Sequence, residues 1–220
     1  MVAGNATLGA DLLEDLGAFD TANTCGGGSG ETLLGARLKD LGSGFRSRIE
    51  MATKVGDPNG CPEGERPLSR AQVAFHLDES LSRLGIDRID LYYMHGFDPL
   101  TPLEETLEAL KAGKIAKFGV SNAMAADLTT VLVLIIGALR AAFTHVQNGF
   151  NRLETADLAE VIPLSQAEGL RYVVFSPLAG GLLPENTLSA RRPVRERDSA
   201  TLRGSMTTCS HPPASRPSGG

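Results

Sequence analysis

The chain has 220 residues, of which 42% are hydrophobic and 21% are charged, and its formal net charge is −5. This length and balance fit one sizeable globular domain, while the dispersed charge and an aromatic content of only 5% argue against nucleic-acid binding. The three cysteines, Cys25, Cys61 and Cys209, show no C-x-x-C spacing. We therefore expect neither a disulfide framework nor a zinc site, and we expect a reducing, cytoplasmic location.

Two apolar segments bear on the question of membranes. The N-terminal stretch MVAGNATLGADLLEDLG lacks the basic start and continuous apolar core of a signal peptide. The most hydrophobic run, VLVLIIGALRAAF at residues 131–143, is too short to span a bilayer and contains an arginine. We expect this run to form a buried core helix and the protein to have no membrane partner.

Short apolar runs that end at a polar residue alternate with helix-like segments along most of the chain. In chain order, the runs end at Asp20, Lys54, His95, Asn122, Gln147 and Ser176. The helix-like segments between them cover residues 31–41, 70–84, 102–111 and 156–168. This repeat predicts consecutive strand–helix units, each of roughly 30 residues.

Strands that alternate with helices predict a parallel sheet with right-handed crossovers. The near-equal units favour a TIM-type (β/α)8 barrel, with a doubly wound open sheet as the alternative. Only about six units are recognisable, whereas a full barrel has eight, so we expect a partial barrel over residues 1–183, truncated at both ends. Residues 184–220 are rich in Arg, Ser, Pro and Gly without apolar periodicity, which predicts a disordered tail.

The polar strand ends are the main sign of function. In a barrel they meet at the carboxyl end of the strands, where active sites lie. Each residue also has an ordinary interpretation: Asp20 and Lys54 as a structural ion pair, His95 as a packed side chain, and Asn122 as a helix cap. Their coincidence at one end of the predicted sheet favours an active site.

The sequence around these strand ends resembles the aldo-keto reductase family. The similar stretches are DTANTCGGGSGETLLG, ATK, IDLYYMHGFDP, GKIAKFGVSN, VQN and VVFSPLAGGLL. They follow one another in the family's order and spacing. The resemblance implies a TIM barrel that uses NADPH to reduce a small aldehyde or ketone to an alcohol, with no metal.

The resemblance also implies a role for each matched residue. His95 would polarise the carbonyl group, and Lys54, paired with Asp20, would lower the pKa of the proton donor. The implied cofactor contacts are Ser121, Asn122 and Gln147 at the nicotinamide carboxamide, Phe175 at its ring, and Ser176, Leu178 and Gly180 at the pyrophosphate. The sequence indicates neither the oligomeric state nor the natural substrate.

Cys25 departs from the family, because it stands where the family has its proton-donating tyrosine. A thiol ends roughly 3–4 Å short of a phenol oxygen, and beside a lysine it tends to ionise. Losing a positioned acid typically costs about 10²–10⁴-fold in rate, and the family's segment that grips the 2′-phosphate of NADPH is absent. We therefore expect impaired activity. The alternatives are a non-catalytic fragment or regulatory paralogue, and a thiol enzyme with a Cys25–His95 pair.

Overall fold

The computed structural model describes residues 17–57, 65–111 and 113–183 of the chain. The strands in these residues are β1 (Ala18–Asp20), β2 (Glu50–Val55), β3 (Ile89–Met94), β4 (Ile115–Ser121), β5 (Phe143–Gly149) and β6 (Arg171–Phe175). The α-helices are α2 (Ser29–Leu41), α3 (Ser43–Arg46), α4 (Arg70–Leu84), α5 (Leu103–Ala109), α6 (Ala125–Leu134), α7 (Gly137–Ala142) and α8 (Val161–Ala167). Short 3₁₀ helices are η1 (Cys25–Gly28), η3 (Ala156–Leu158) and η4 (Ala179–Gly181).

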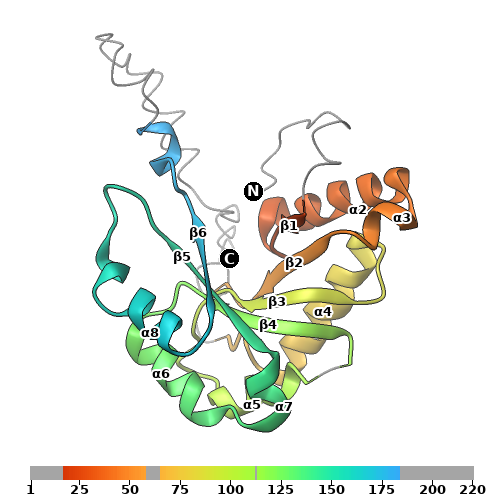
Figure 1. Cartoon of the computed structure of the whole chain (residues 1–220). Coiled ribbons are helices and arrows are strands. Elements are labelled where there is room, and N and C mark those ends of the chain that lie inside the picture. The colour runs from red at the N-terminus through yellow and green to blue at the C-terminus, as the bar shows by residue number, and fades with distance from the viewer. Residues whose placement is uncertain (1–16, 58–64, 112, 184–220) are drawn as a thin grey trace, which may run out of the picture.

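The strands of the described residues form one six-stranded parallel sheet in the order β1-β2-β3-β4-β5-β6. Each strand pairs with the next one along the chain, as in a barrel, whereas a doubly wound sheet reverses its order at a switch point. The sheet curls into a half-barrel with the helices around its outer side (Figure 1). The predicted partial, parallel barrel is therefore confirmed, and the doubly wound alternative is wrong for this part of the chain.

The two faces of the sheet are packed differently because successive strand residues point to opposite sides. Outward-facing residues such as Tyr92 and Phe118 pack against helix residues such as Leu77 and Leu128 in the main hydrophobic core. The inner face has a much smaller apolar cluster, formed by Ala52, Leu91 and Tyr93. Polar side chains therefore occupy much of the inner face, above all at the carboxyl end of the strands.

Helix α4 matches the predicted range 70–84, and its ends follow ordinary capping rules. The Ser69 side chain accepts a hydrogen bond from the Gln72 backbone N–H at 3.4 Å, and Gly85 ends the helix in the left-handed region with φ 65°. Helix α2 packs directly on the end of α4, because a Cβ on Gly35 would lie only 2.2 Å from the Arg83 carbonyl oxygen. Glycine is therefore needed at position 35 for the two helices to approach.

The predicted buried helix over residues 131–143 is wrong. Helix α6 ends at Leu134, the chain is extended at Ile135 and Ile136, Gly137 has φ 55°, and Phe143 already begins β5. Val133 and Ile136 are 74% and 78% exposed, so these two residues of the run lie outside the core. A continuous helix would leave no chain to start the strand, and the left-handed glycine provides the turn that it needs.

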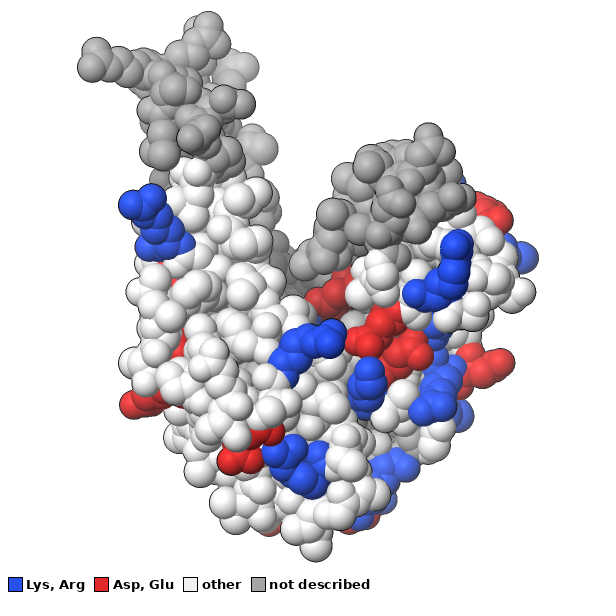
Figure 2. Space-filling model, viewed as in Figure 1, with Lys and Arg blue, Asp and Glu red and all other residues white. Residues whose placement is uncertain are grey.

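Two further observations concern the length of the apolar helices and the distribution of surface charge. In the part of the chain that the structure describes, no helix is both long and apolar enough to cross a membrane. On the face shown in Figure 2, basic and acidic side chains lie next to one another rather than in a patch of one sign. The predicted disordered tail, Cys61 and Cys209 all lie outside the described residues.

Candidate active site

Asp20 and Lys54 form the most buried ion pair at the carboxyl end of the sheet. Lys54 Nζ lies 2.5 Å from Asp20 Oδ1, and the two side chains are 8% and 17% exposed. Lys54 Nζ also donates to the Thr21 carbonyl oxygen at 2.9 Å and lies 5.6 Å from the centre of the Tyr93 ring. The ammonium group is thereby held in one place, as a partly desolvated cation requires.

Gln147 joins this pair from the other side of the half-barrel. Its Nε2 donates to Asp20 Oδ2 at 2.7 Å, so each carboxylate oxygen of Asp20 accepts one hydrogen bond. Gln147 lies on β5 and Asp20 at the end of β1, two strands separated by three others in the sheet. The inner face is therefore curved enough to bring the first and fifth strands into side-chain contact.

His95 follows the last residue of β3 and is fixed through its backbone. Its N–H donates to the Val55 carbonyl oxygen at 2.8 Å, and its carbonyl oxygen accepts from Asn122 Nδ2 at 2.8 Å. The imidazole Nδ1 is 3.9 Å from Asp57 Oδ2. This nitrogen is buried with no hydrogen-bond partner among the described residues.

Burial lowers the pKa of His95, and the positive charge of Lys54 lowers it further, whereas the charges of Asp57 and Asp20 oppose the shift. The net effect is a pKa below the usual value of about 6.5. The environment therefore favours the neutral imidazole. A neutral imidazole has one nitrogen that donates and one that accepts.

This shift predicts how stability depends on pH. Below about pH 6.5 the unfolded chain binds a proton at His95 that the folded protein does not accept, so the free energy of unfolding should fall as the pH drops from 6.5 toward the lowered pKa. His145 is also shifted downward by burial and adds to the slope. Urea unfolding from pH 7.5 to 5.0 checks this, and His95→Gln should make the dependence shallower without removing it. An unchanged slope in His95→Gln would contradict the assignment.

Ser121 and Asn122 lie at the end of β4, next to His95. Asn122 has φ 54°, its N–H donates to the Gln147 carbonyl oxygen at 3.0 Å, and its Nδ2 lies 3.4 Å from Ser121 Oγ. The helix-cap interpretation of Asn122 is wrong, because the residue at the start of α6 is Met124. Its left-handed backbone instead turns the amide toward His95, a strained conformation of the kind common at functional sites.

The segment after β6 has the geometry expected for a flat, phosphorylated ligand. A Cβ on Gly149 would lie 3.2 Å from the Phe175 ring, so the ring lies flush against this glycine. Ser176, Ala179 and Gly180 have φ values of 53°, 48° and 65°. Successive left-handed residues make a concave backbone that suits an anion, and the partly exposed Phe175 ring suits stacking. Leu178 is exposed beside them, so this segment presents an aromatic face and a concave backbone to solvent.

Cys25 opens the glycine-rich turn η1, between β1 and α2. Its N–H donates to the Ala22 carbonyl oxygen at 3.1 Å, and Gly26, Gly27 and Gly28 follow with φ values of 58°, 64° and 89°. Only glycine adopts three such conformations in a row at low cost. The partly exposed Cys25 is thus fixed four residues after Thr21, whose carbonyl oxygen binds Lys54.

The structure thus brings Asp20, Lys54, His95, Asn122 and Gln147 together, as the strand-end pattern predicted. It also adds residues that the sequence analysis missed: Thr21, Asp57 and Tyr93. Asp57 and Tyr93 could have been found, because Asp57 lies three residues after the predicted strand end at Lys54 and Tyr93 lies two residues before His95. Nothing in the local sequence marks the Thr21 carbonyl oxygen.

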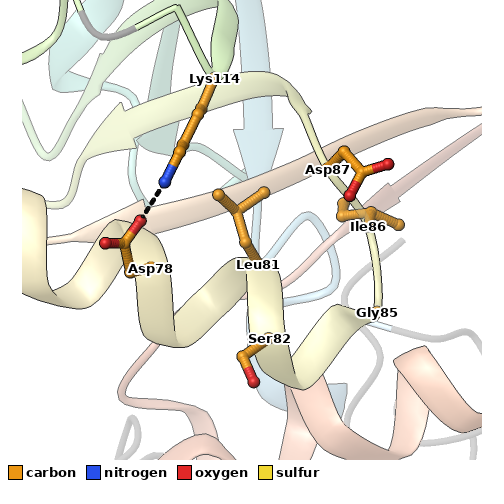
Figure 3. A pocket seen from close by; sticks show the side chains of 7 residues that line it. All are labelled: Asp78, Leu81, Ser82, Gly85, Ile86, Asp87 and Lys114. Atoms are coloured by element: carbon orange, nitrogen blue, oxygen red, sulfur yellow. Dashed lines mark hydrogen bonds and ion pairs between the residues drawn. The ribbon is translucent and has the colours of Figure 1, made fainter.

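No group of metal ligands occurs among the residues that the structure describes. A surface cavity of about 440 Å³ lies at the other end of the sheet, where α4 leads into β3 (Figure 3). Leu81 and Ile86 form part of its wall, and the Lys114–Asp78 ion pair of 2.6 Å crosses it. Both charged side chains are more than half exposed. This cavity therefore has no buried ion pair like that of Asp20 and Lys54, and it is a weaker candidate for an active site.

Comparison with known proteins shows which family the chain belongs to. The sequence matches the aldo/keto reductase family over residues 15–211. It is 34% identical to the uncharacterized oxidoreductase YrpG of Bacillus subtilis over 84% of this chain and 60% of YrpG. It is 33% identical to aflatoxin B1 aldehyde reductase member 2 of Rattus norvegicus over 82% of this chain and 49% of that protein.

The fold comparison agrees with the sequence comparison. The crystal structure of the thermostable aldo-keto reductase Tm1743, in complex with the inhibitor epalrestat, superposes with a TM-score of 0.67 at 29% identity. The superposition covers 81% of this chain and 63% of Tm1743. The chain therefore spans about half to three-fifths of the length of the curated relatives that it matches.

Proposed function

Because the chain belongs to the aldo/keto reductase family, we propose that it reduces aldehydes or ketones to alcohols with NADPH, at a rate limited by Cys25. The observation that carries this proposal is the Asp20–Lys54 ion pair of 2.5 Å, which lies with Gln147 and His95 at the carboxyl end of the sheet. In a parallel barrel this is the end where catalysis takes place. One of the matched relatives is named an aldehyde reductase, which supports a carbonyl substrate.

The proposed cofactor residues lie at the carboxyl ends of β4, β5 and β6. When bound, NADPH supplies the hydride that reduces the carbonyl carbon. Ser121, Asn122 and Gln147 would hold its carboxamide, since their hydroxyl and amide groups are of the right kind to donate and accept. Phe175 would stack on the nicotinamide ring. The segment with Ser176, Leu178 and Gly180, in which Ser176 and Gly180 have left-handed backbones, would receive the pyrophosphate.

His95 would act on the carbonyl oxygen of the substrate. Its lowered pKa favours the neutral imidazole, whose one N–H can donate to the oxygen. A donor aimed at a developing alkoxide stabilises it most in a site that excludes water. Lys54 adds a positive charge nearby, held in place by Asp20 and the Thr21 carbonyl oxygen.

The proton that converts the alkoxide to the alcohol has no efficient donor in this arrangement. Cys25 lies in the turn that follows Asp20, where the family has a tyrosine, and its short side chain would need a water molecule to reach the alkoxide. A thiolate formed near Lys54 could not donate at all. This observation favours a second candidate function, in which the chain is a non-catalytic or regulatory relative that still binds the cofactor or a partner.

Calorimetric titration with NADPH, and with NADH alongside, tests the cofactor assignment. We expect micromolar binding with NADPH preferred, and about tenfold weaker binding in Gln147→Leu, which loses the carboxamide contact. The matched control is Gln166→Leu on the exposed side of α8, which should bind like the parent. A folded chain that binds neither nucleotide would overturn the reductase proposal for this chain.

A further inference from the structure

Glu31 is a fully buried carboxylate outside the proposed active site. It lies in the first turn of α2 and is 0% exposed. Its Oε1 accepts a hydrogen bond from Thr53 Oγ1 at 2.7 Å, and its Oε2 accepts one from Arg83 Nη1 at 2.7 Å. A buried carboxylate is tolerated only with such partners. Glu31 therefore joins three elements that are distant in sequence: α2, β2 and α4.

Arg83 completes the network from the last turn of α4. Its Nη2 lies 2.8 Å from Glu79 Oε2 in the same helix, which fixes the direction of the guanidinium group. The other side of this group lies against the glycine-rich turn, because a Cβ on Gly28 would be 2.9 Å from the guanidinium carbon. Arg83 thus contacts both Glu31 and the last residue of the turn that Cys25 opens.

The network lies directly behind the proposed site. Thr53 and Lys54 are neighbours on β2 and point to opposite faces of the sheet, so one strand connects Glu31 on the outside with Asp20 on the inside. The backbone of the turn is also bound to β2, since the Asn23 N–H donates to the Lys54 carbonyl oxygen at 3.2 Å. The position of the turn relative to Lys54 therefore depends on both contacts.

We propose that Arg83 and Glu31 are positioning residues that fix the Cys25 turn against the strand that carries Lys54. Three left-handed glycines make this turn easy to deform, and only Gly28 is buried among them. The ion pair supplies the rigidity that the glycines lack. The assignment of this turn to a catalytic site rests on the proposed function. The positioning of the turn by Arg83 is independent of that function.

The test measures how fast iodoacetamide alkylates Cys25 in a chain carrying Cys61→Ser and Cys209→Ser, so that Cys25 is the remaining thiol. We expect Arg83→Met to raise the rate about tenfold, because a loosened turn opens locally more often. Glu31→Gln should raise it less, and Arg83→Lys should restore part of the protection. The control is Arg140→Met, which breaks the more exposed ion pair between Arg140 on α7 and Glu168 at the end of α8 and should leave the rate unchanged.

Amide hydrogen exchange over β2 and β3 separates positioning from general loss of stability. The proposal requires faster alkylation with sheet exchange unchanged. It is overturned if the variants alkylate at the parental rate, or if exchange over the whole sheet rises by the same factor. Should Arg83→Met fail to fold, Glu31→Gln and Arg83→Lys carry the same test. No nucleotide is present in these measurements, so absent NADPH binding would reject the reductase proposal and leave this inference standing.

Discussion

Cys25→Tyr is expected to raise the rate of NADPH-dependent carbonyl reduction by about 10²–10⁴-fold, the usual worth of a positioned general acid. The phenol oxygen extends roughly 3–4 Å beyond the position of the thiol, which removes the need for a water relay. The hydroxyl also keeps its proton at neutral pH better than a thiol near a lysine does. The measurement is steady-state reduction of a panel of small aldehydes, followed by the absorbance of NADPH.

The shape-matched control is Cys25→Phe, which adds the ring without the hydroxyl. It should give no comparable gain, because filling the space beside Gly30 does not supply a proton. A gain as large in Cys25→Phe as in Cys25→Tyr would mean that packing of the turn, not proton donation, limits the rate. A Cys25→Tyr variant that binds NADPH but remains inactive would favour the non-catalytic alternative.

The fold could be predicted from the sequence because its strands and helices obey simple local rules. Helix α4 runs from a serine cap to a left-handed glycine, and its predicted range is the observed one. The strand ends were close as well: β1 ends at Asp20 and β4 at Ser121. Lys54 and Gln147 lie inside their strands instead of at the last residue, because the backbone ladder continues past the polar side chain.

The failures came where long-range packing overrides local pattern. The apolar run at residues 131–143 has the composition of one buried helix, yet Gly137 divides it and Phe143 begins β5. The site shows the same limit. The strand-end residues were predicted to converge, but the hydrogen bond between Gln147 and Asp20 spans 127 residues, and its existence depends on how strongly the sheet curls.

Glu31 shows why contacts between residues distant in the chain cannot be predicted from the sequence alone. From the sequence, Glu31 looks like an ordinary exposed acidic residue in the first turn of a helix, where its negative charge would stabilise the helix by interacting with the helix dipole. In the structure it is fully buried and paired with Arg83, 52 residues away. Nothing in the spacing of either residue predicts the pair, because the partner is chosen by the packing of α2 on α4 at Gly35.

Lys54→Met is expected to lower the free energy of unfolding by about 3–5 kcal/mol, even though methionine is the more hydrophobic side chain. The substitution leaves the largely buried carboxylate of Asp20 without its cation, and an uncompensated buried charge is costly. Gln147 Nε2 still donates to Asp20 Oδ2, but one neutral donor cannot replace an ammonium group. Urea unfolding at pH 7 measures the change, and the exposed pair at Lys114 and Asp78 gives the control, since Lys114→Met should cost less than about 1 kcal/mol.

The double variant Asp20→Asn/Lys54→Met separates the lost ion pair from the lost packing of the lysine. Asparagine keeps an oxygen that accepts from Gln147 while removing the buried charge, so the double variant should be more stable than Lys54→Met alone. Equal or lower stability of the double variant would mean that Lys54 acts mainly through its contacts with the Thr21 carbonyl oxygen and the Tyr93 ring. In that case the Asp20–Lys54 contact would be an ion pair in geometry but would contribute little to the free energy of folding.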